Sequence, residues 1–188
     1  MAFDLRHLLR TQFRWTEPEP GSGLLVSDRS GWWRDPHILE SLGPGLAALF
    51  PSGEPTVVVS PEVTGFLVGP LVARALGVGF VEAYRAGARR PIAEPMTWAE
   101  VPADHRGDTQ WLGVRTRLIG TGDRILLVDD WAVTGAQTRG LHALAARLDA
   151  TVVGTAVIVD ECPPPTAAEL GIRGLLTGAD LSCEPGDA

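Results

Sequence analysis

The segment ILLVDDWAVTGAQT, residues 125–138, joins an apolar run to two adjacent aspartates and then to a loop of small residues. The apolar run predicts a buried strand, and the pattern from Thr134 onward predicts a helix after the loop. A single aspartate at the end of a strand is most often a helix cap or a solvated side chain. Asp129 and Asp130 are adjacent, however, and neighbouring carboxylates repel each other. Ligands of open α/β sheets bind beyond the carboxyl ends of the strands, so we expect a binding site here.

The loop VTGAQT (133–138) would place small residues at the start of a helix. Free N–H groups and the helix dipole bind phosphate at such a position. The two carboxylates can accept hydrogen bonds from a vicinal diol or approach a divalent cation. The segment contains neither the GKS/T of a Walker loop nor a GxGxxG dinucleotide motif. Together these features predict a pocket for a phosphorylated sugar.

Apolar strands alternate with helices along the chain, which predicts an α/β fold with a mainly parallel central sheet flanked by helices. Helices are expected at 2–15, 36–50, 64–76 and 134–148, and strands at 24–26, 56–60, 77–84, 111–118, 124–130 and 151–160. The strand at 111–118 is expected to pair with the strand at 124–130 around the GTGD turn. The polar, proline-containing segment 86–110 is expected to be one long loop.

A chain of 188 residues is long enough for one domain with a proper core. We divide it into N-terminal helices with a hood segment (1–53), a phosphosugar-binding core (54–160, including the loop 86–110) and a C-terminal segment (161–188). The net charge of −7 argues against a nucleic-acid or anionic membrane surface. All 16 basic residues are arginine, so anions must be bound by arginine or backbone amides.

The sequence also predicts a cytoplasmic protein. The first 15 residues have no continuous apolar stretch of the kind found in secretory signals. The most apolar window, 56–81, is interrupted by Pro61, Glu62, Pro70 and Arg74, which a membrane-spanning helix tolerates poorly. The two cysteines, Cys162 and Cys183, have no metal-ligand spacing and are expected to be ordinary thiols.

ILLVDDWAVTGAQT resembles the phosphoribosyl-diphosphate signature of type I phosphoribosyltransferases. SPEVTGFLVGPLVARALGVGFVEAYRAG (60–87), GSGLLVSDRSGWWRDPHILESL (21–42) and VVGTAVIVD (152–160) are similar to the adenine phosphoribosyltransferase-like branch. The resemblance covers about residues 3–160. It implies the type I phosphoribosyltransferase fold, with an N-terminal hood and a long lid loop at 86–110 that closes over the reaction.

The implied activity is Mg²⁺-dependent transfer of a 5-phosphoribosyl group from phosphoribosyl diphosphate to a nitrogenous, purine-like base, which releases pyrophosphate and gives a nucleoside monophosphate. By resemblance, Asp129 and Asp130 bind the ribose hydroxyls and orient the metal, and Val26 and Trp131 contact the base. Glu62–Val63 is the expected cis peptide bond of the pyrophosphate loop. The residues implied to bind phosphoribosyl diphosphate, besides the two aspartates, are Val133, Thr134, Gly135, Ala136, Gln137, Thr138, Glu62, Val63, Thr64, Gly65 and Arg85.

An acid or base is needed for the incoming nitrogen, and the branch is thought to use a glutamate of the lid. Glu100 and Glu94 are the candidates, and Glu100 is taken as the catalytic residue with Asp129 and Asp130. His105 lies in the same segment but is a weaker candidate, because lone histidines often have no chemical task.

The chain departs from the pattern of the branch at several positions. Thr64 replaces an arginine of the pyrophosphate loop, and Ala136 and Gln137 replace the usual Gly and Thr of the phosphate loop. Val26 stands where an aromatic ring would stack on the purine, and such a ring contributes roughly 1 kcal/mol. The phosphate and ribose parts therefore match better than the base pocket, which argues against adenine as the acceptor.

Two other functions remain open from the sequence. One is a non-catalytic sensor of phosphoribosyl diphosphate or of a nucleotide, and the other is a phosphoribosyltransferase with a specialised non-purine acceptor. The expected partners are phosphoribosyl diphosphate, a small nitrogenous base and a second copy of the chain, since family members usually form homodimers. No nucleic acid or membrane is expected to bind.

Overall fold

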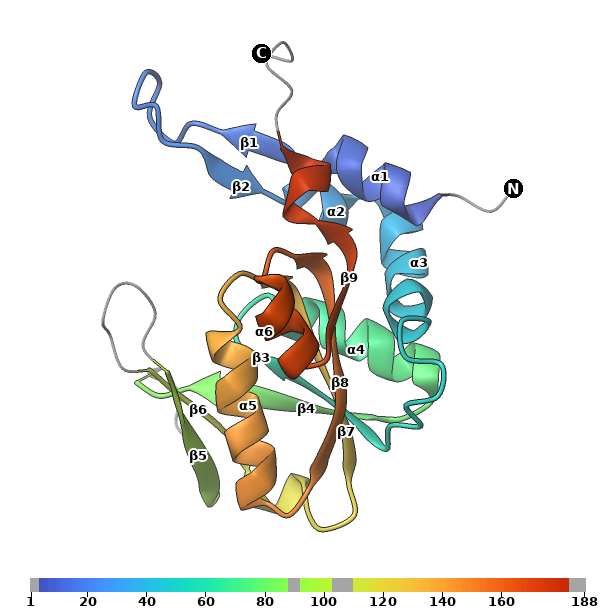
Figure 1. The fold of residues 1–188 in the computed structure, drawn as a ribbon, viewed down its shortest axis with the longest axis vertical. Helices are drawn as coiled ribbons and strands as arrows, with labels where there is room; N and C mark the ends of the chain where they lie inside the picture. Colours follow the sequence, from blue (N-terminus) through green and yellow to red (C-terminus); the bar gives the residue numbers. More distant parts are fainter. Residues whose placement is uncertain (1–3, 88–91, 103–109, 183–188) are drawn as a thin grey trace.

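The computed structural model describes residues 4–87, 92–102 and 110–182 (Figure 1). The helices are α1 (Leu5–Gln12), α2 (Ser30–Arg34), α3 (Pro36–Ala47), α4 (Gly65–Leu76), α5 (Ala136–Arg147) and α6 (Pro164–Glu169), with 3₁₀ helices η1 (Thr116–Leu118) and η2 (Gly178–Leu181). The strands are β1 (Arg14–Thr16), β2 (Val26–Asp28), β3 (Val57–Pro61), β4 (Gly79–Arg85), β5 (Met96–Val101), β6 (Gln110–Arg115), β7 (Arg124–Ala132), β8 (Thr151–Asp160) and β9 (Ile172–Thr177).

One sheet of seven strands forms the centre of the molecule, in the order β5-β6-β4-β3-β7-β8-β9. The strands from β4 to β9 in this order pair in parallel, whereas β6 pairs antiparallel with both β4 and β5. The expected α/β fold with a mainly parallel sheet is confirmed. β5 forms one edge of the sheet, at the lower left of Figure 1, and β6 lies between β5 and β4.

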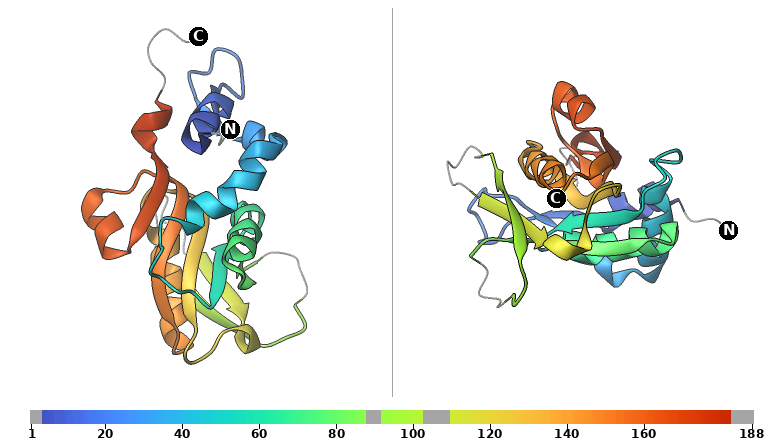
Figure 2. Two further views of the ribbon diagram at one scale, coloured as in Figure 1. Left: turned by 90° about the vertical axis from the view of Figure 1, so that its right-hand side faces the viewer. Right: turned by 90° about the horizontal axis from the view of Figure 1, so that it is seen from below.

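Helices cover both faces of the sheet, as the left view of Figure 2 shows. On one face α3 and α4 pack against the side chains of alternate strand residues such as Val58, Leu126 and Ile158, and α1 packs against α3. On the other face α5 packs against the intervening residues, such as Val59 and Leu127. Because the parallel strands are buried from both sides, they are apolar almost without alternation, which explains why they were readily found in the sequence.

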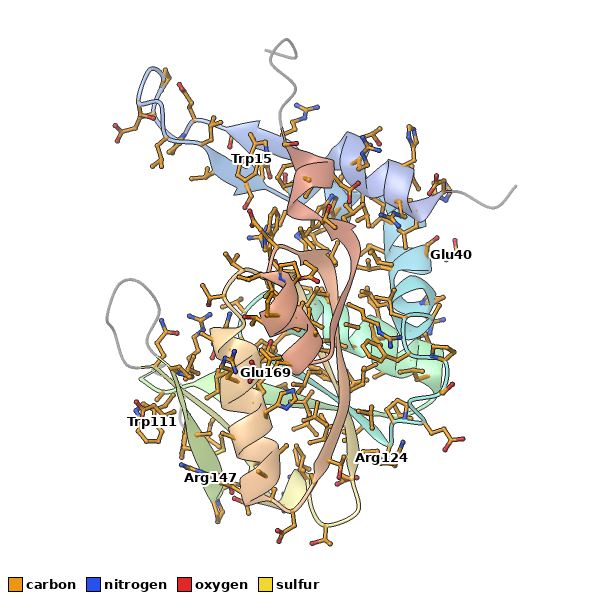
Figure 3. The ribbon with its side chains drawn as sticks, viewed as in Figure 1. Trp15, Glu40, Trp111, Arg124, Arg147 and Glu169 are labelled. Carbon is orange, nitrogen blue, oxygen red and sulfur yellow. The ribbon has the colours of Figure 1, made fainter. Side chains whose placement is uncertain are left out.

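The N-terminal segment 4–34, which we call the hood, lies beyond one end of the sheet, at the top of Figure 1. Its hairpin pairs β1 with β2 antiparallel. Trp15 of this hairpin donates from Nε1 to the carbonyl of Leu181 at 2.7 Å (Figure 3). Trp32 of α2 is fully buried and donates to the carbonyl of Leu9 at 2.8 Å. The contact of Trp15 attaches the hood to the C-terminal end of the described chain, whereas that of Trp32 holds α2 to α1 within the hood.

Local signals fix several helix ends. Asp35 caps α3 by accepting from the N–H of His37 at 2.8 Å, with Pro36 at the first position, as the sequence predicted. Gly77 ends α4 in the left-handed conformation, at φ +70°. The expected first helix is shorter than predicted, because residues from Arg14 onward form β1.

Two other expectations were wrong. The segment 86–110 is not one long loop, because it contains β5, whose alternate residues Ala99 and Val101 are buried. β6 does not pair with β7 around the GTGD turn, since its neighbours are β4 and β5. The chain leaves β6 through η1, and the GTGD turn then leads into β7, which lies between β3 and β8.

None of the helices in the described ranges is both long enough and apolar enough to cross a membrane.

Candidate active site

The carboxyl ends of three parallel neighbours, β4, β3 and β7, meet at one edge of the sheet. β3 leads into Glu62, β4 ends at Arg85, and β7 carries Asp129 and Asp130 near its end. Segments that are far apart in the sequence are therefore adjacent in space. This edge is where open α/β sheets bind their ligands.

A cavity of about 260 Å³ opens at this edge. It is lined by Arg85, Asp129, Trp131, Ala132 and residues 133–138, together with Val101, Pro102 and Gln110. The structure thus brings together the first aspartate of the pair, the whole loop VTGAQT and an arginine. The volume and the mixed lining suit a small polar ligand.

The loop between β7 and α5 has the geometry of an anion site at a helix N-terminus. Gly135 has φ +73°, and α5 begins at Ala136, whose N–H is hydrogen-bonded to Oγ1 of Thr134 at 3.3 Å. A Cβ on Gly135 would lie 2.7 Å from Cδ1 of Leu170 and 2.9 Å from Cγ2 of Thr166, so only glycine fits. Ala136 does not need a positive φ, and its departure from the family pattern costs the loop nothing in backbone strain.

The two aspartates have different environments. Asp129 is half-buried and lines the cavity, and its Oδ1 accepts from the N–H of Asp130 at 2.9 Å. Asp130 is only 7% exposed and forms an ion pair with Arg29 of the hood. Burial and the neighbouring charge of Asp130 raise the pKa of Asp129 well above its usual value, and the positive charge of Arg85 opposes this. A cation or a set of donors brought by a ligand would favour the ionised Asp129.

Arg85 extends along the edge of the cavity and is held at several points. Its N–H donates to Oε2 of Glu62 at 3.0 Å, and Nε donates to the carbonyl of Glu62 at 3.2 Å. Nη1 donates to Oε1 of Gln110 at 3.2 Å, and Nη2 donates to Oε1 of Gln137 at 3.0 Å. The guanidinium is thereby fixed between the segment after β3 and the loop after β7.

Trp131 forms the wall of the cavity nearest the hood. Its ring packs against Phe13 and Trp15, with centroid distances of 5.9 and 6.4 Å, and Nε1 donates to Glu161 at 2.9 Å. The guanidinium carbon of Arg29 lies 6.0 Å from the centre of the same ring. Trp131 therefore joins the cavity to the hood.

The segment Glu62–Gly65 passes close to Asp129 without lining the cavity. The Glu62–Val63 peptide bond is cis, as the resemblance implied. Thr64 precedes α4 and makes no capping hydrogen bond with its side chain. A Cβ on Gly65 would lie 3.5 Å from Oδ1 of Asp129 and 2.9 Å from Cβ of Ser60. Glycine is required here by the close approach to Ser60, and Asp129 lies at ordinary contact distance.

Besides Asp130 and the segment 62–65, three candidate side chains do not line the cavity. Val26 is 41% exposed on β2 and is paired with Thr16. Glu100 is exposed on β5 opposite Trp111, on the other face of the strand from Val101, which lines the cavity. Glu94 forms an ion pair with Arg117, which lowers the pKa of Glu94. His105 lies outside the described residues.

Sequence reasoning missed three polar side chains at or beside the site: Arg29, Gln110 and Glu161. Glu161 directly follows β8, so the rule about the carboxyl ends of parallel strands could have found it. Gln110 begins β6, and its position depends on a strand pairing that was predicted wrongly. Nothing in the local sequence signals that Arg29 reaches a residue 101 positions away.

The chain was compared with known proteins. No family model matches it. It is 32% identical over 142 residues to a xanthine phosphoribosyltransferase of Lactobacillus delbrueckii subsp. bulgaricus, covering 76% of this chain and 75% of that protein. It is 30% identical over 176 residues to an adenine phosphoribosyltransferase of Pectobacterium carotovorum, covering 94% and 89%. The crystal structure of adenine phosphoribosyltransferase from Leishmania donovani superposes with a TM-score of 0.79 at 25% identity, covering 100% of this chain and 86% of that one.

Both the level of identity and the extent of these matches agree with the geometry of the cavity. The chain is an enzyme of the type I phosphoribosyltransferase family, in the branch of the adenine phosphoribosyltransferases.

Proposed function

We propose that this enzyme transfers the 5-phosphoribosyl group of phosphoribosyl diphosphate to a ring nitrogen of a purine-like base. The observation that carries the proposal is the grouping of Asp129, Arg85 and the loop 133–138 around one cavity. These elements offer a carboxylate for a diol, a cation for a diphosphate and backbone amides for a phosphate monoester. A ligand that matches all three groups at once is a phosphorylated sugar that carries a diphosphate.

Each part of the donor has a matching group. The loop 134–138 would hold the 5-phosphate through N–H groups at the start of α5. Asp129, whose carboxylate lines the cavity, would accept hydrogen bonds from the ribose hydroxyls. Asp130, paired with Arg29 of the hood, would hold this end of β7 in place. Arg85 would face the diphosphate, with the segment 62–65 behind it.

The residues present fit Mg²⁺ bound together with the diphosphate. In the described ranges no group of three or more His, Cys, Asp or Glu side chains could hold a metal without help. Mg²⁺ typically uses one or two carboxylates together with substrate phosphates. Asp129 faces the cavity and would hold the ion, whereas Asp130 is already paired with Arg29. Mg²⁺ would neutralise part of the charge of the departing pyrophosphate.

In the transfer a bond forms between C1 of the ribose and the nitrogen of the base, while the bond from C1 to the diphosphate oxygen breaks. Pyrophosphate leaves with the electron pair, so positive charge develops on the sugar ring and negative charge on the leaving group. The guanidinium of Arg85 is fixed before the reaction by its hydrogen bonds, which is the arrangement that stabilises developing negative charge. A proton lost by the base needs an acceptor, and Glu100 stays the proposed residue, although its side chain lies on the face of β5 away from the cavity.

Trp131 lies on the side of the cavity where the base would enter, below the hood. The two relatives described above are named as a xanthine and an adenine phosphoribosyltransferase. Val26 is exposed on β2 and supplies no aromatic ring. We expect a purine acceptor other than adenine to be preferred.

The proposal includes a homodimer. Val63 and Leu67 are 71% and 53% exposed at the start of α4, beside the pyrophosphate segment, and a second copy would cover such apolar side chains. Light scattering after size-exclusion chromatography measures the mass directly. A mass of one chain at micromolar concentration would contradict this part of the proposal.

The activity is tested by pyrophosphate release from phosphoribosyl diphosphate and Mg²⁺ with adenine, hypoxanthine, guanine, xanthine and pyrimidine bases. Mass spectrometry identifies the product. We expect at least one purine to stimulate release and to appear as its nucleoside monophosphate. Release that no base stimulates would contradict the proposal.

A further inference from the structure

Gln137 is in the first turn of α5, and its side chain reaches Arg85 at the end of β4. Oε1 of Gln137 accepts from Nη2 of Arg85 at 3.0 Å, and both residues line the cavity. The contact joins the loop expected to bind the 5-phosphate to the arginine expected to face the diphosphate. The resemblance to the family predicts a shorter threonine at this position, so the bridge is a feature of this chain.

The acceptors around the guanidinium of Arg85 are all uncharged. Nε donates to the carbonyl of Glu62, Nη1 to the amide of Gln110 and Nη2 to the amide of Gln137. Within the part of the chain that the structure describes, Arg85 forms no ion pair. Amide oxygens orient an arginine without neutralising it, so its charge remains available to an anion. A carboxylate at 137 would instead form an ion pair with Arg85 and repel a diphosphate.

We infer that Gln137 is a positioning residue for Arg85, and that its side chain serves the pyrophosphate half of the donor rather than the 5-phosphate half. This inference rests on the proposed function. The backbone of the loop binds the 5-phosphate, because its N–H groups and the left-handed Gly135 are sufficient for an anion site. The side chain of Gln137 holds the guanidinium where the leaving group departs.

The alternative role is direct contact of Gln137 with the 5-phosphate. The two roles predict different losses for two small anions, inorganic pyrophosphate and ribose 5-phosphate. Calorimetric binding of each to the full chain needs no base and no turnover. Gln137→Leu keeps much of the side-chain volume but removes the acceptor, and Gln137→Glu keeps an acceptor but adds a negative charge.

We expect Gln137→Leu to weaken pyrophosphate binding about fivefold, because one orienting hydrogen bond is lost, and to change ribose 5-phosphate binding less than twofold. Gln137→Glu should weaken pyrophosphate binding more than the leucine variant does. In an Arg85→Met background, Gln137→Leu should have no further effect on pyrophosphate, since the group that it positions is gone. Gln110 also accepts from Arg85 but lies outside the loop 133–138. Gln110→Leu is therefore the matched control, and it should weaken pyrophosphate binding as Gln137→Leu does.

A loss of ribose 5-phosphate binding equal to the loss of pyrophosphate binding would overturn the inference, as would additive effects of Arg85→Met and Gln137→Leu. In either case the wild-type protein still binds both anions, and the proposed function stands. A wild-type protein that binds neither anion would overturn the proposed function and this inference with it.

Discussion

Arg29 of the hood and Asp130 of β7 form an ion pair that joins two segments 101 residues apart. The pair makes the two neighbouring aspartates unequal, because Asp130 has a cationic partner and is almost fully buried while Asp129 faces the cavity. It also attaches the hood directly to the strand that carries the site. Binding at Asp129 and the position of the hood are thus connected through adjacent residues.

Asp129→Asn should make the ligand-free protein more stable and much less active. The amide keeps the shape and can still accept from the N–H of Asp130, but it removes a carboxylate placed next to another one. We expect the melting temperature at pH 7 to rise by about 2–4 °C, which corresponds to roughly 1 kcal/mol for a chain of this size. The value of kcat/KM should fall about 100-fold, because the substitution removes a charged group that is proposed to contact the ribose of the donor. Calorimetry and initial rates measure the two effects.

Asp130→Asn is the matched control for this change. It removes the same charge from the next residue, but it leaves Arg29 without its partner, so the melting temperature should fall. Two variants that shift the melting temperature in the same direction would contradict the unequal roles of the two aspartates.

Arg29→Met should loosen the hood. The substitution leaves the buried carboxylate of Asp130 unpaired, which we expect to cost about 2 kcal/mol, or roughly 4–8 °C in melting temperature. Hydrogen exchange should rise in β1 and β2. Arg34→Met changes the same type of side chain in the same segment at an exposed position, and it should have little effect. Equal effects of the two variants would show that the ion pair does not fix the hood.

Gly135→Ala should damage both the fold and the phosphate site. The residue has φ +73°, and a Cβ would collide with Leu170 and Thr166 of the segment around α6. We expect a loss of about 1–3 kcal/mol in the free energy of unfolding, measured with denaturant, together with weaker binding of ribose 5-phosphate. Gly120→Ala is the control, since a Cβ there would meet no atom within 4 Å. Unchanged ribose 5-phosphate binding in a folded Gly135→Ala protein would argue against the loop as the phosphate site.

Cys162 should react slowly with alkylating reagents. Burial and the charge of Asp160 raise the pKa of the Cys162 thiol to about 11, so roughly one molecule in a thousand carries the thiolate at pH 8. Because the folded-state pKa lies above the unfolded value, the thiol stabilises the fold below pH 9, and this contribution is lost as the pH rises towards 11. Iodoacetamide kinetics in a Cys183→Ser background, folded and in urea, measure the difference. Equal alkylation rates of the folded and the urea-unfolded protein at pH 8 would contradict the raised pKa of Cys162.

The sequence was sufficient for the central part of the fold and of the site because the relevant signals are local. A strand buried on both faces is an apolar run, and the segment after Val128 combines two acids with a Thr-Gly turn. Parallel topology then requires that Glu62, Arg85 and Asp129 meet at one edge, so a local pattern was enough to predict a grouping in space.

The remaining features depend on contacts between distant segments. β5 was missed because its sequence, MTWAEV, follows a polar stretch with several prolines and is only partly apolar. β6 pairs with β4, which is not its neighbour in the sequence. The GTGD turn between β6 and β7 does not reveal this pairing, because it suggests a hairpin of β6 with β7. Arg29 has no local signal, because its partner Asp130 is 101 residues away. The loop VTGAQT predicts Gln137 as a site residue, but its contact with Arg85 depends on how β4 and α5 are placed.

The most direct test of the proposed site is the initial rate of pyrophosphate release from phosphoribosyl diphosphate, with Mg²⁺ and the best purine base, for the wild-type protein and for the Asp129→Asn/Asp130→Asn double variant. We predict that release depends on the base in the wild-type protein and is lost in a double variant that remains folded by circular dichroism. Release at the wild-type rate in the folded double variant would contradict it, because the cavity beside Asp129 would then not be the site of the reaction.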